Sequence, residues 1–283
     1  MSDTSASASP FSARVVAVLI AVAAISFGAV LVMAGWAPEM RDRNQAGAHP
    51  YSTSAIGYNG FVRLLESAGY PVDVSRLESD LDTRPWGLMI ITLPPYSSVI
   101  ALEDRALTPT TLVVLPKWSG WTDPLNASRQ ADTKLIEAED LKSSIERFYP
   151  DAEILRVKVP ETVEAPFGSV AIKPDEGLQL IKDAGLETVI EVDGAALVAY
   201  DPVHSFYILS DPDMINTFGL ARRENARFAV QLVDFLRYDS DEPILLDATL
   251  HGFQRTENLL KMMFSAPYIG VTFVGLAAAL LLG

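Results

Sequence analysis

Short apolar runs alternate with amphipathic stretches through the middle of the chain. The runs WGLMIITLPP and TTLVVLPKW are apolar, rich in β-branched residues and bounded by proline. This composition is typical of strands that are buried on both faces of a parallel sheet. The stretch AEDLKSSIERFY carries a charged helical face and predicts a helix that lies over the sheet.

The segment SAIGYNGFVRLLESAGYPVDVS predicts a helix followed by a strand. Ser54 is the expected helix cap, and Gly69 is the expected end of the helix, before the strand-like YPVDV. The apolar residues recur at helical spacing and share one face, made of Phe61, Leu64, Leu65 and Ala68.

The second half of the chain is richer in alternating, strand-like runs. The turn VDGA joins ETVIEV to ALVAYD and predicts an antiparallel hairpin. The strand SFYILSD, the helix NARFAVQLVDFLRY and the strand PILLDA then predict a β-α-β unit with a right-handed crossover. We therefore expect an α/β fold with a mostly parallel sheet that is extended by antiparallel strands.

Both ends of the chain contain long uncharged stretches. Residues 15–37 carry no ionisable side chain and are long enough to cross a hydrocarbon core of about 30 Å, whereas the apolar part of a signal peptide usually spans only about 7–15 residues. Residues 266–283 have the same character and predict a second, truncated transmembrane helix. The expected order is a tail (1–14), a transmembrane helix (15–37), an α/β domain (38–265) and a second transmembrane helix (266–283). Charges near the spans leave the orientation open, because the positive-inside rule applies poorly to loops longer than about 60 residues.

Composition narrows the possible functions. The formal net charge is −14, which argues against a broad nucleic-acid-binding face, because phosphate binding depends on clustered Lys and Arg. The chain has no cysteine, which excludes disulfides, thiolate metal sites and a cysteine nucleophile. Nucleic acid is therefore not an expected partner, whereas the two uncharged spans make the lipid bilayer one.

Polar side chains follow several of the predicted strands. Ser119, Asp211, Asp213 and Asp247 all come after such runs, so they are expected at the carboxyl edge of the sheet, where open α/β sheets bind ligands. In SDPDMINTFG, Asp211 and Pro212 are typical of a tight turn, and either Asp213 or Asn216 is suited to cap a helical turn. We favour this interpretation over a metal site, because a calcium loop supplies more oxygen ligands at regular spacing.

The next helix begins near Asn225, whose neighbours form an apolar stripe that is expected to pack on the sheet. Arg222 and Arg223 precede it. They are candidates for anion binding at a helix start, but a charge pair of this kind is usually a solvated face.

The segments YILSDPDMINTFGLARRENARFAVQLVDFL and PILLDATLHGF resemble the membrane proteins of domain-of-unknown-function family 4350, as do the N-terminal YSTSAIGYNGFVRLLESAGYPVDV and the flanking spans. The resemblance implies a flavodoxin-like, class I glutamine-amidotransferase-like domain. It also implies MoxR-type AAA+ ATPases and von Willebrand A-type proteins as partners, with the domain outside the cytoplasm on the cytoplasmic membrane. In that family the last strand commonly ends in an acidic pair and a histidine before glycine. This chain keeps Asp247, His251 and Gly252 but has Ala248 in place of the second acid.

An enzymatic role is the alternative to a binding role. Amidotransferase chemistry is excluded because the cysteine nucleophile is missing. A triad of Ser119, His251 and Asp247 can be written, but Lys117 replaces the first glycine of a nucleophile elbow. We therefore expect a non-catalytic domain without a cofactor or metal. Its expected binding edge comprises Ser119, Asp211, Asp213, Asn216, Asn225, Asp247 and His251.

Overall fold

The computed structural model describes residues 45–77, 87–97, 102 and 110–254, with isolated positions between 15 and 30 and residues 270 and 274. The chain divides into two compact units, residues 42–255 and residues 1–41 with 256–283. The first unit lies within the predicted α/β domain, 38–265, and contains all the strands described below.

Among the described residues, no helix combines the length and the apolar character that a membrane crossing requires. The predicted transmembrane helices, 15–37 and 266–283, fall mostly on positions outside the described part of the chain.

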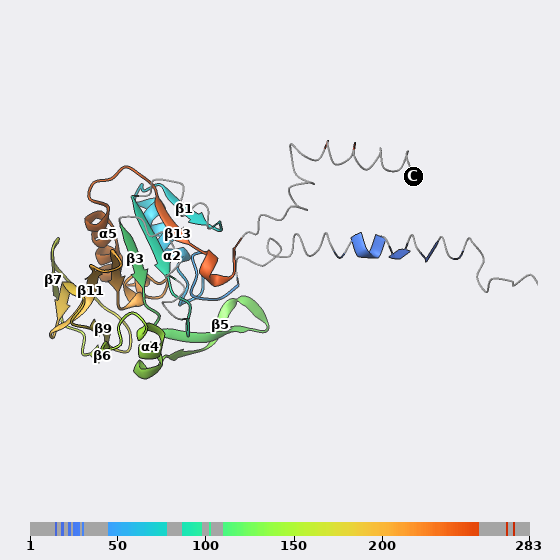
Figure 1. Cartoon of the computed structure of the whole chain (residues 1–283). Coiled ribbons are helices and arrows are strands. Elements are labelled where there is room, and N and C mark those ends of the chain that lie inside the picture. The colour runs from blue at the N-terminus through green and yellow to red at the C-terminus, as the bar shows by residue number, and fades with distance from the viewer. Residues whose placement is uncertain are drawn as a thin grey trace, which may run out of the picture. The chain divides into compact units, whose positions relative to one another are not determined.

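A nine-stranded sheet forms the centre of the domain within the described residues (Figure 1). Its order is β1-β13-β2-β3-β12-β11-β9-β6, with β10 paired to β11. Five neighbouring strands are parallel: β1 (Val72–Ser75), β13 (Ile244–Asp247), β2 (Leu88–Thr92), β3 (Thr111–Val114) and β12 (Phe206–Leu209). The antiparallel extension comprises β11 (Ala195–Asp201), β9 (Leu178–Lys182), β6 (Glu153–Val157) and β10 (Glu187–Val192). The mixed, mostly parallel sheet predicted from the sequence is confirmed.

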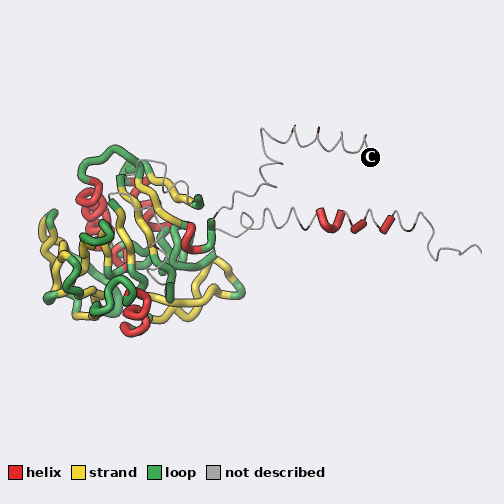
Figure 2. Tube along the Cα trace, viewed as in Figure 1, coloured by secondary structure: helices red, strands yellow, loops and turns green. Residues whose placement is uncertain are grey.

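Figure 2 distinguishes the helices (red) from the strands (yellow), and two separate hydrophobic cores place described helices on both faces of the sheet. The helices α2 (Asn59–Ser67) and α5 (Arg223–Arg237) pack on one face, where Phe61 and Phe228 join a core that includes Ile90. The helix α4 (Ala138–Ile145) packs on the other face, where Leu141 joins a second core that includes Ile91. Alternate residues of one strand therefore enter different cores, which explains why β2, β3 and β13 are apolar throughout.

Two hairpins lie outside the main sheet. β4 (Trp118–Asp123) pairs with β5 (Asn126–Leu135), and β7 (Val163–Ala165) pairs with β8 (Gly168–Val170). The hairpin predicted at VDGA forms between β10 and β11, and both of its turn residues, Asp193 and Gly194, have positive φ (50° and 76°). This is the backbone that a two-residue type I′ turn requires.

The predicted start of the first helix is wrong. Tyr58 occupies the position before α2, and no side chain caps the helix there. Ser54 instead lies in a turn, because its carbonyl accepts a hydrogen bond from the Gly57 amide. Its hydroxyl contacts Ser52 (2.9 Å) and donates to Gln130 (3.3 Å).

Candidate functional site

The carboxyl ends of β3 and β12 meet at one edge of the sheet. The two strands are adjacent and parallel, with Val114 opposite Leu209. Lys117 lies three residues beyond Val114, and Asp211 lies two residues beyond Leu209, so the register brings an ammonium group and a carboxylate together. A lysine after one strand and an acid after its neighbour thus form the centre of the site.

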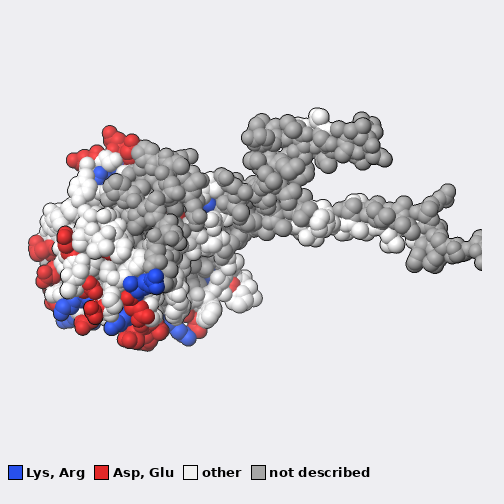
Figure 3. Space-filling model, viewed as in Figure 1, with Lys and Arg blue, Asp and Glu red and all other residues white. Residues whose placement is uncertain are grey.

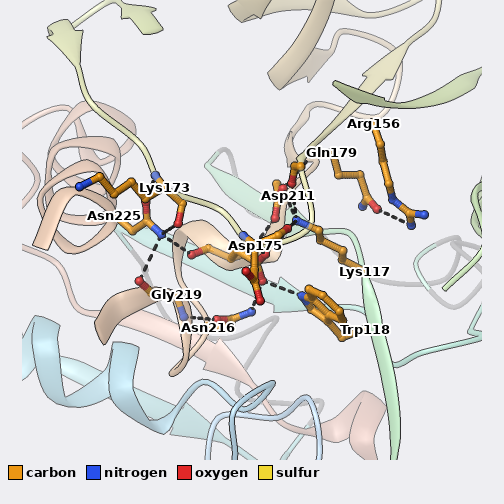
Figure 4. A network of polar contacts seen from close by, with 12 residues as sticks. Lys117, Trp118, Arg156, Lys173, Asp175, Gln179, Asp211, Asn216, Gly219 and Asn225 are labelled. Atoms are coloured by element: carbon orange, nitrogen blue, oxygen red, sulfur yellow. Dashed lines mark hydrogen bonds and ion pairs between the residues drawn. The ribbon is translucent and has the colours of Figure 1, made fainter. Parts of the chain in front are cut away.

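Lys117 is completely buried and contacts four oxygen atoms (Figure 4). Its ammonium donates to Oδ2 of Asp211 and Oδ2 of Asp213, both at 2.8 Å. It also donates to the carbonyl oxygens of Asp175 (2.7 Å) and Gly177 (2.8 Å). An ammonium has three protons, so one proton is shared between two of the four acceptor oxygens. These contacts compensate a charge that would otherwise be very costly to bury.

Asp211 organises the turn that leaves β12. Its Oδ1 accepts the Asp213 amide (2.9 Å) at the start of the 3₁₀ helix η2 (Pro212–Met214), which confirms the predicted turn role. Its Oδ2 also accepts the Gln179 amide of β9 (2.8 Å). Burial and the nearby charge of Asp213 raise the pKa of Asp211 to about 6, against the opposing effect of Lys117. The residue is therefore both a cap and one of the three charged members, with Lys117 and Asp213, of a buried ion cluster.

The metal alternative is not supported by what surrounds these carboxylates. The Lys117 ammonium stands between Asp211 and Asp213, at the place where a shared cation would bind. In the part of the chain that the structure describes, no three His, Asp or Glu side chains are grouped so as to hold a metal ion.

Asp213 connects the buried cluster to the next turn. Its Oδ1 accepts hydrogen bonds from Trp118 Nε1 (2.7 Å) and Asn216 Nδ2 (2.6 Å). The Asn216 carbonyl oxygen accepts the Gly219 amide (2.6 Å). A Cβ at Gly219 would lie 1.8 Å from the backbone oxygen of Asp213, so this position requires glycine. Asn216 thus holds the turn that follows η2 against the cluster.

Asn225 lies in the first turn of α5, as predicted, and is fully buried. Its Oδ1 accepts the Lys173 amide (2.7 Å), and its Nδ2 donates to the Lys173 carbonyl (2.9 Å). Nδ2 also contacts the carbonyl oxygens of Asp213 (3.2 Å) and Gly219 (3.1 Å). Asn225 therefore joins the segment that precedes β9 to the turn after β12 and does not face solvent.

A cavity of about 260 Å³ lies beside the cluster. It shares Trp118 and Asn216 with the buried network. Its exposed lining surface is mainly apolar, although four of the eight lining residues are polar or charged. The residues that define its character are Ile56, Trp118, Asp175, Glu176, Asn216 and Phe218.

Asp247 and His251 belong to a different part of the same edge. Asp247 ends β13, and two strands separate β13 from β12, which is three strand spacings or roughly 14 Å. Asp247 Oδ1 accepts the Thr249 amide (2.7 Å), and His251 Nε2 contacts Thr92 Oγ1 (2.9 Å). The expectation that these residues lie beside Asp211 and Asp213 is wrong, because β2 and β3 come between them.

Ser119 is not at a strand-to-helix elbow. It lies within β4, which runs into its hairpin partner β5. Its Oγ accepts a hydrogen bond from the Tyr96 hydroxyl (3.2 Å). The geometry expected for a serine nucleophile is therefore absent at this residue.

Sequence reasoning missed Lys117, Trp118 and Gln179 as parts of the site. Gln179 is buried and donates from Nε2 to the carbonyl oxygens of Pro116 (3.0 Å) and Ser210 (2.7 Å), so it links three segments. The available signal was the lysine directly after a buried run, in TTLVVLPKW. This lysine could be assigned to the site only if β3 were known to lie beside β12, the strand that precedes Asp211.

One comparison with known proteins supports the family named from the sequence. None of the curated proteins compared with the chain matches it. A family model described as a domain of unknown function, DUF4350, matches residues 50–233, which include Lys117, Asp211, Asp213 and Asn225. The match covers more than half of the 283 residues and the whole buried cluster. The chain therefore belongs to the DUF4350 family.

Proposed function

We propose that the α/β domain is a non-catalytic binding domain that recognises a ligand or a partner protein at the cavity beside Trp118. The main support for this proposal is that the charged groups at this edge are buried and bonded within the protein, whereas the exposed surface beside them is mainly apolar. Lys117, Asp211 and Asp213 are fully buried. Their hydrogen bonds are made with one another and with neighbouring segments of the chain. What faces outward is a cavity lined mainly by apolar groups, which is the usual character of a binding site.

The order of the parallel strands supports a flavodoxin-like origin for the domain. Numbered along the chain, the five parallel strands lie in the order 1-5-2-3-4. Counting the last strand, β13, as the first converts this to 2-1-3-4-5, the flavodoxin-like order. We propose a cyclically permuted member of that fold, related to class I glutamine amidotransferases but without their cysteine.

We also propose that the domain is tethered to the cytoplasmic membrane by residues 15–37 and 266–283 and works outside the cytoplasm. The uncharged composition of both segments supports the tether. MoxR-type AAA+ ATPases and von Willebrand A-type proteins are the proposed partners, on the family resemblance alone. On the face shown in Figure 3, acidic and basic side chains are intermixed over the described surface without a continuous basic patch, in keeping with a partner other than nucleic acid.

Site-specific photo-crosslinking tests the binding role. A photoreactive phenylalanine analogue in place of Phe218, which lines the cavity, should give adducts in intact cells. The same analogue in place of Val203, which is 78% exposed and lies outside the cavity, is the matched control. Adducts that are equally abundant at both positions would contradict a binding site at the cavity.

A serine-reactive fluorophosphonate tests the hydrolase alternative on the full chain. We expect no labelling of the wild type. Labelling that disappears in Ser119→Ala but persists in Ser143→Ala, an exposed helical serine, would overturn the non-catalytic assignment.

A further inference from the structure

The cavity beside Trp118 combines aromatic walls with negative charge. Trp118 and Phe218 supply the aromatic surface, and Asp175 and Glu176 supply two carboxylates. None of the described residues that line it is basic. Aromatic faces and carboxylates both attract cations, and the effect is larger in partly desolvated surroundings.

The loop that carries Glu176 is held in an unfavourable backbone conformation. Glu176 has a φ of 50°, a left-handed value that is uncommon for a residue other than glycine. The carbonyl groups on either side of it, those of Asp175 and Gly177, both accept hydrogen bonds from Lys117. The Asp175 amide additionally donates to Asp213 Oδ2 (3.1 Å). The buried cluster thus fixes an exposed carboxylate at the cavity wall, and backbone strain of this kind gathers at binding sites.

The aromatic side of the cavity is also fixed in advance. The hydrogen bond from Trp118 Nε1 to Asp213 Oδ1 (2.7 Å) sets the orientation of the indole. A ligand that stacks on this ring does not have to order it, and this lowers the entropic cost of binding.

The rim of the cavity already holds a guanidinium group. The Arg222 guanidinium lies 4.7 Å from the centre of the Phe218 ring and 3.5 Å from Asp175 Oδ1. Phe218 and Asp175 both line the cavity. The protein's own side chain therefore shows that this aromatic and acidic surface accommodates a cation.

We propose that this cavity binds an alkylammonium or guanidinium group on an apolar stem, as found on a lysine or arginine side chain of a partner protein or on a free amine. The stem lies against Trp118 and Ile56, and the cation lies beside Glu176. Arg222 competes with the incoming cation at the rim. The inference rests on the proposed binding function and names the chemistry of its ligand.

Titration of the full chain with four small probes of one length tests the inference. The probes are n-butylammonium, n-butylguanidinium, 1-butanol and butyrate, and the readout is the indole ¹⁵N–¹H signal of Trp118, identified among the four tryptophans by its loss in Trp118→Phe. We expect both cations to shift this signal and to bind up to roughly fivefold more tightly than butanol, since an exposed ion pair contributes about that factor. Butyrate should bind least. Equal binding of butanol and the cations, or no shift with either cation, would overturn the proposal.

Variants separate the charge of the loop from the shape of the cavity. Glu176→Gln should lower the affinity for both cations by roughly three- to fivefold and leave the affinity for butanol unchanged. Glu164→Gln, which removes an exposed acid from β7 outside the cavity, is the control and should change neither. Arg222→Gln should strengthen cation binding, because it removes the internal competitor. Cation affinity that is unchanged in Glu176→Gln would contradict the proposal.

Longer ligands identify where the cation comes from. A pentapeptide with a central lysine and the same peptide with norleucine are compared with free agmatine. Tighter binding of the lysine peptide than of agmatine would assign the cation to a partner protein, whereas the reverse order would assign it to a free amine, and both results support a cation site. Crosslinks at Phe218 without cation binding would refute the ligand chemistry and leave the proposed binding function standing.

Discussion

Two buried aspartates lie at opposite ends of β12 and behave in opposite ways. Asp201 ends β11 and pairs with Phe206 at the start of β12, whereas Asp211 follows Leu209 at the other end of that strand. Both side chains are almost completely removed from solvent. The pKa of Asp201 is lowered, and the pKa of Asp211 is raised to about 6.

The two environments differ in how many donors serve each carboxylate. Asp201 accepts hydrogen bonds from the amides of Val203 (2.8 Å) and His204 (3.0 Å), from the Tyr149 hydroxyl and from His204 Nδ1 (2.6 Å). Burial alone would raise its pKa, and these bonds outweigh burial. Asp211 must share the Lys117 ammonium with the second carboxylate of Asp213. Burial therefore does not decide the direction of the shift; the balance of donors and charges around each carboxylate does.

The largest expected effect comes from removing the shared cation. Lys117→Met keeps most of the side-chain volume but leaves two buried carboxylates without a counter-charge. We expect the free energy of unfolding to fall by about 3–5 kcal/mol, as for other broken buried ion pairs. Urea denaturation at pH 7 measures this loss.

Lys158→Met is the matched control, because Lys158 is exposed, and its cost should stay within about 0.5 kcal/mol. Adding Asp211→Asn to Lys117→Met should recover part of the loss, so the two changes together should cost less than their sum. A cost below about 1 kcal/mol for Lys117→Met would show that the cluster is not a buried ion pair in solution.

The fold could be predicted from the sequence more completely than this buried cluster. The continuous apolar runs of β2, β3 and β13 identify strands buried on both faces, and Asp193 and Gly194 identify the hairpin, because these signals are local. The pairing of Lys117 with Asp211 depends on β12 lying beside β3, although 94 residues separate the two side chains. Strand order is a property of the whole sheet and has no local signature.

The same reason explains the misplaced part of the predicted site. Asp247 ends β13 and His251 follows it, and β13 lies between β1 and β2 in the sheet. The sequence correctly placed Asp211 and Asp247 at the carboxyl edge of the sheet. It did not show the order of the strands, and this order sets the distance between the two residues along that edge. Ser119 was misplaced for a different reason, because TTLVVLPKWSGW gave no sign that a second strand, β4, begins at Trp118.

Replacing each aspartate by asparagine sharpens the comparison. At Asp211, both oxygens accept from groups that can only donate, namely two backbone amides and the Lys117 ammonium, so the new NH₂ must face a donor. We expect Asp211→Asn to cost about 1–3 kcal/mol. At Asp201, the Tyr149 hydroxyl and the His204 ring nitrogen can switch to accepting, so Asp201→Asn should cost about 1 kcal/mol or less. Unfolding free energies at pH 7 that rank the two variants in the reverse order would contradict this account.

The pH dependence of stability should have opposite signs at the two sites. The folded pKa of Asp211, about 6, lies above the unfolded value of about 3.9, so its contribution is fully present below pH 4 and is lost as the pH rises to about 6. The folded pKa of Asp201 is depressed, so its contribution is present above pH 4 and is lost as the pH falls below that. The unfolding free energy of the wild type minus that of Asp211→Asn should therefore decrease from pH 4 to 6.5. The corresponding difference for Asp201→Asn should decrease from pH 5 to 3. If the two free-energy differences changed with pH in the same direction, the proposed opposite pKa shifts of Asp201 and Asp211 would be contradicted.

The smallest expected effect concerns the side chain that completes the Asp201 cluster. His204 is 36% exposed at its side chain, and its ring stacks on Phe148 with centroids 4.4 Å apart and planes 9° from parallel. His204→Phe keeps the stacked ring and the backbone amide bond to Asp201 and removes only the Nδ1 contact. Because the remaining donors still satisfy Asp201 and the lost contact is partly solvated, we expect a cost of about 1 kcal/mol or less at pH 7. His204→Ala, which also removes the stack, is the reference and should cost more. A loss above about 2 kcal/mol for His204→Phe would mean that this single contact, rather than the full set of donors, keeps the pKa of Asp201 low.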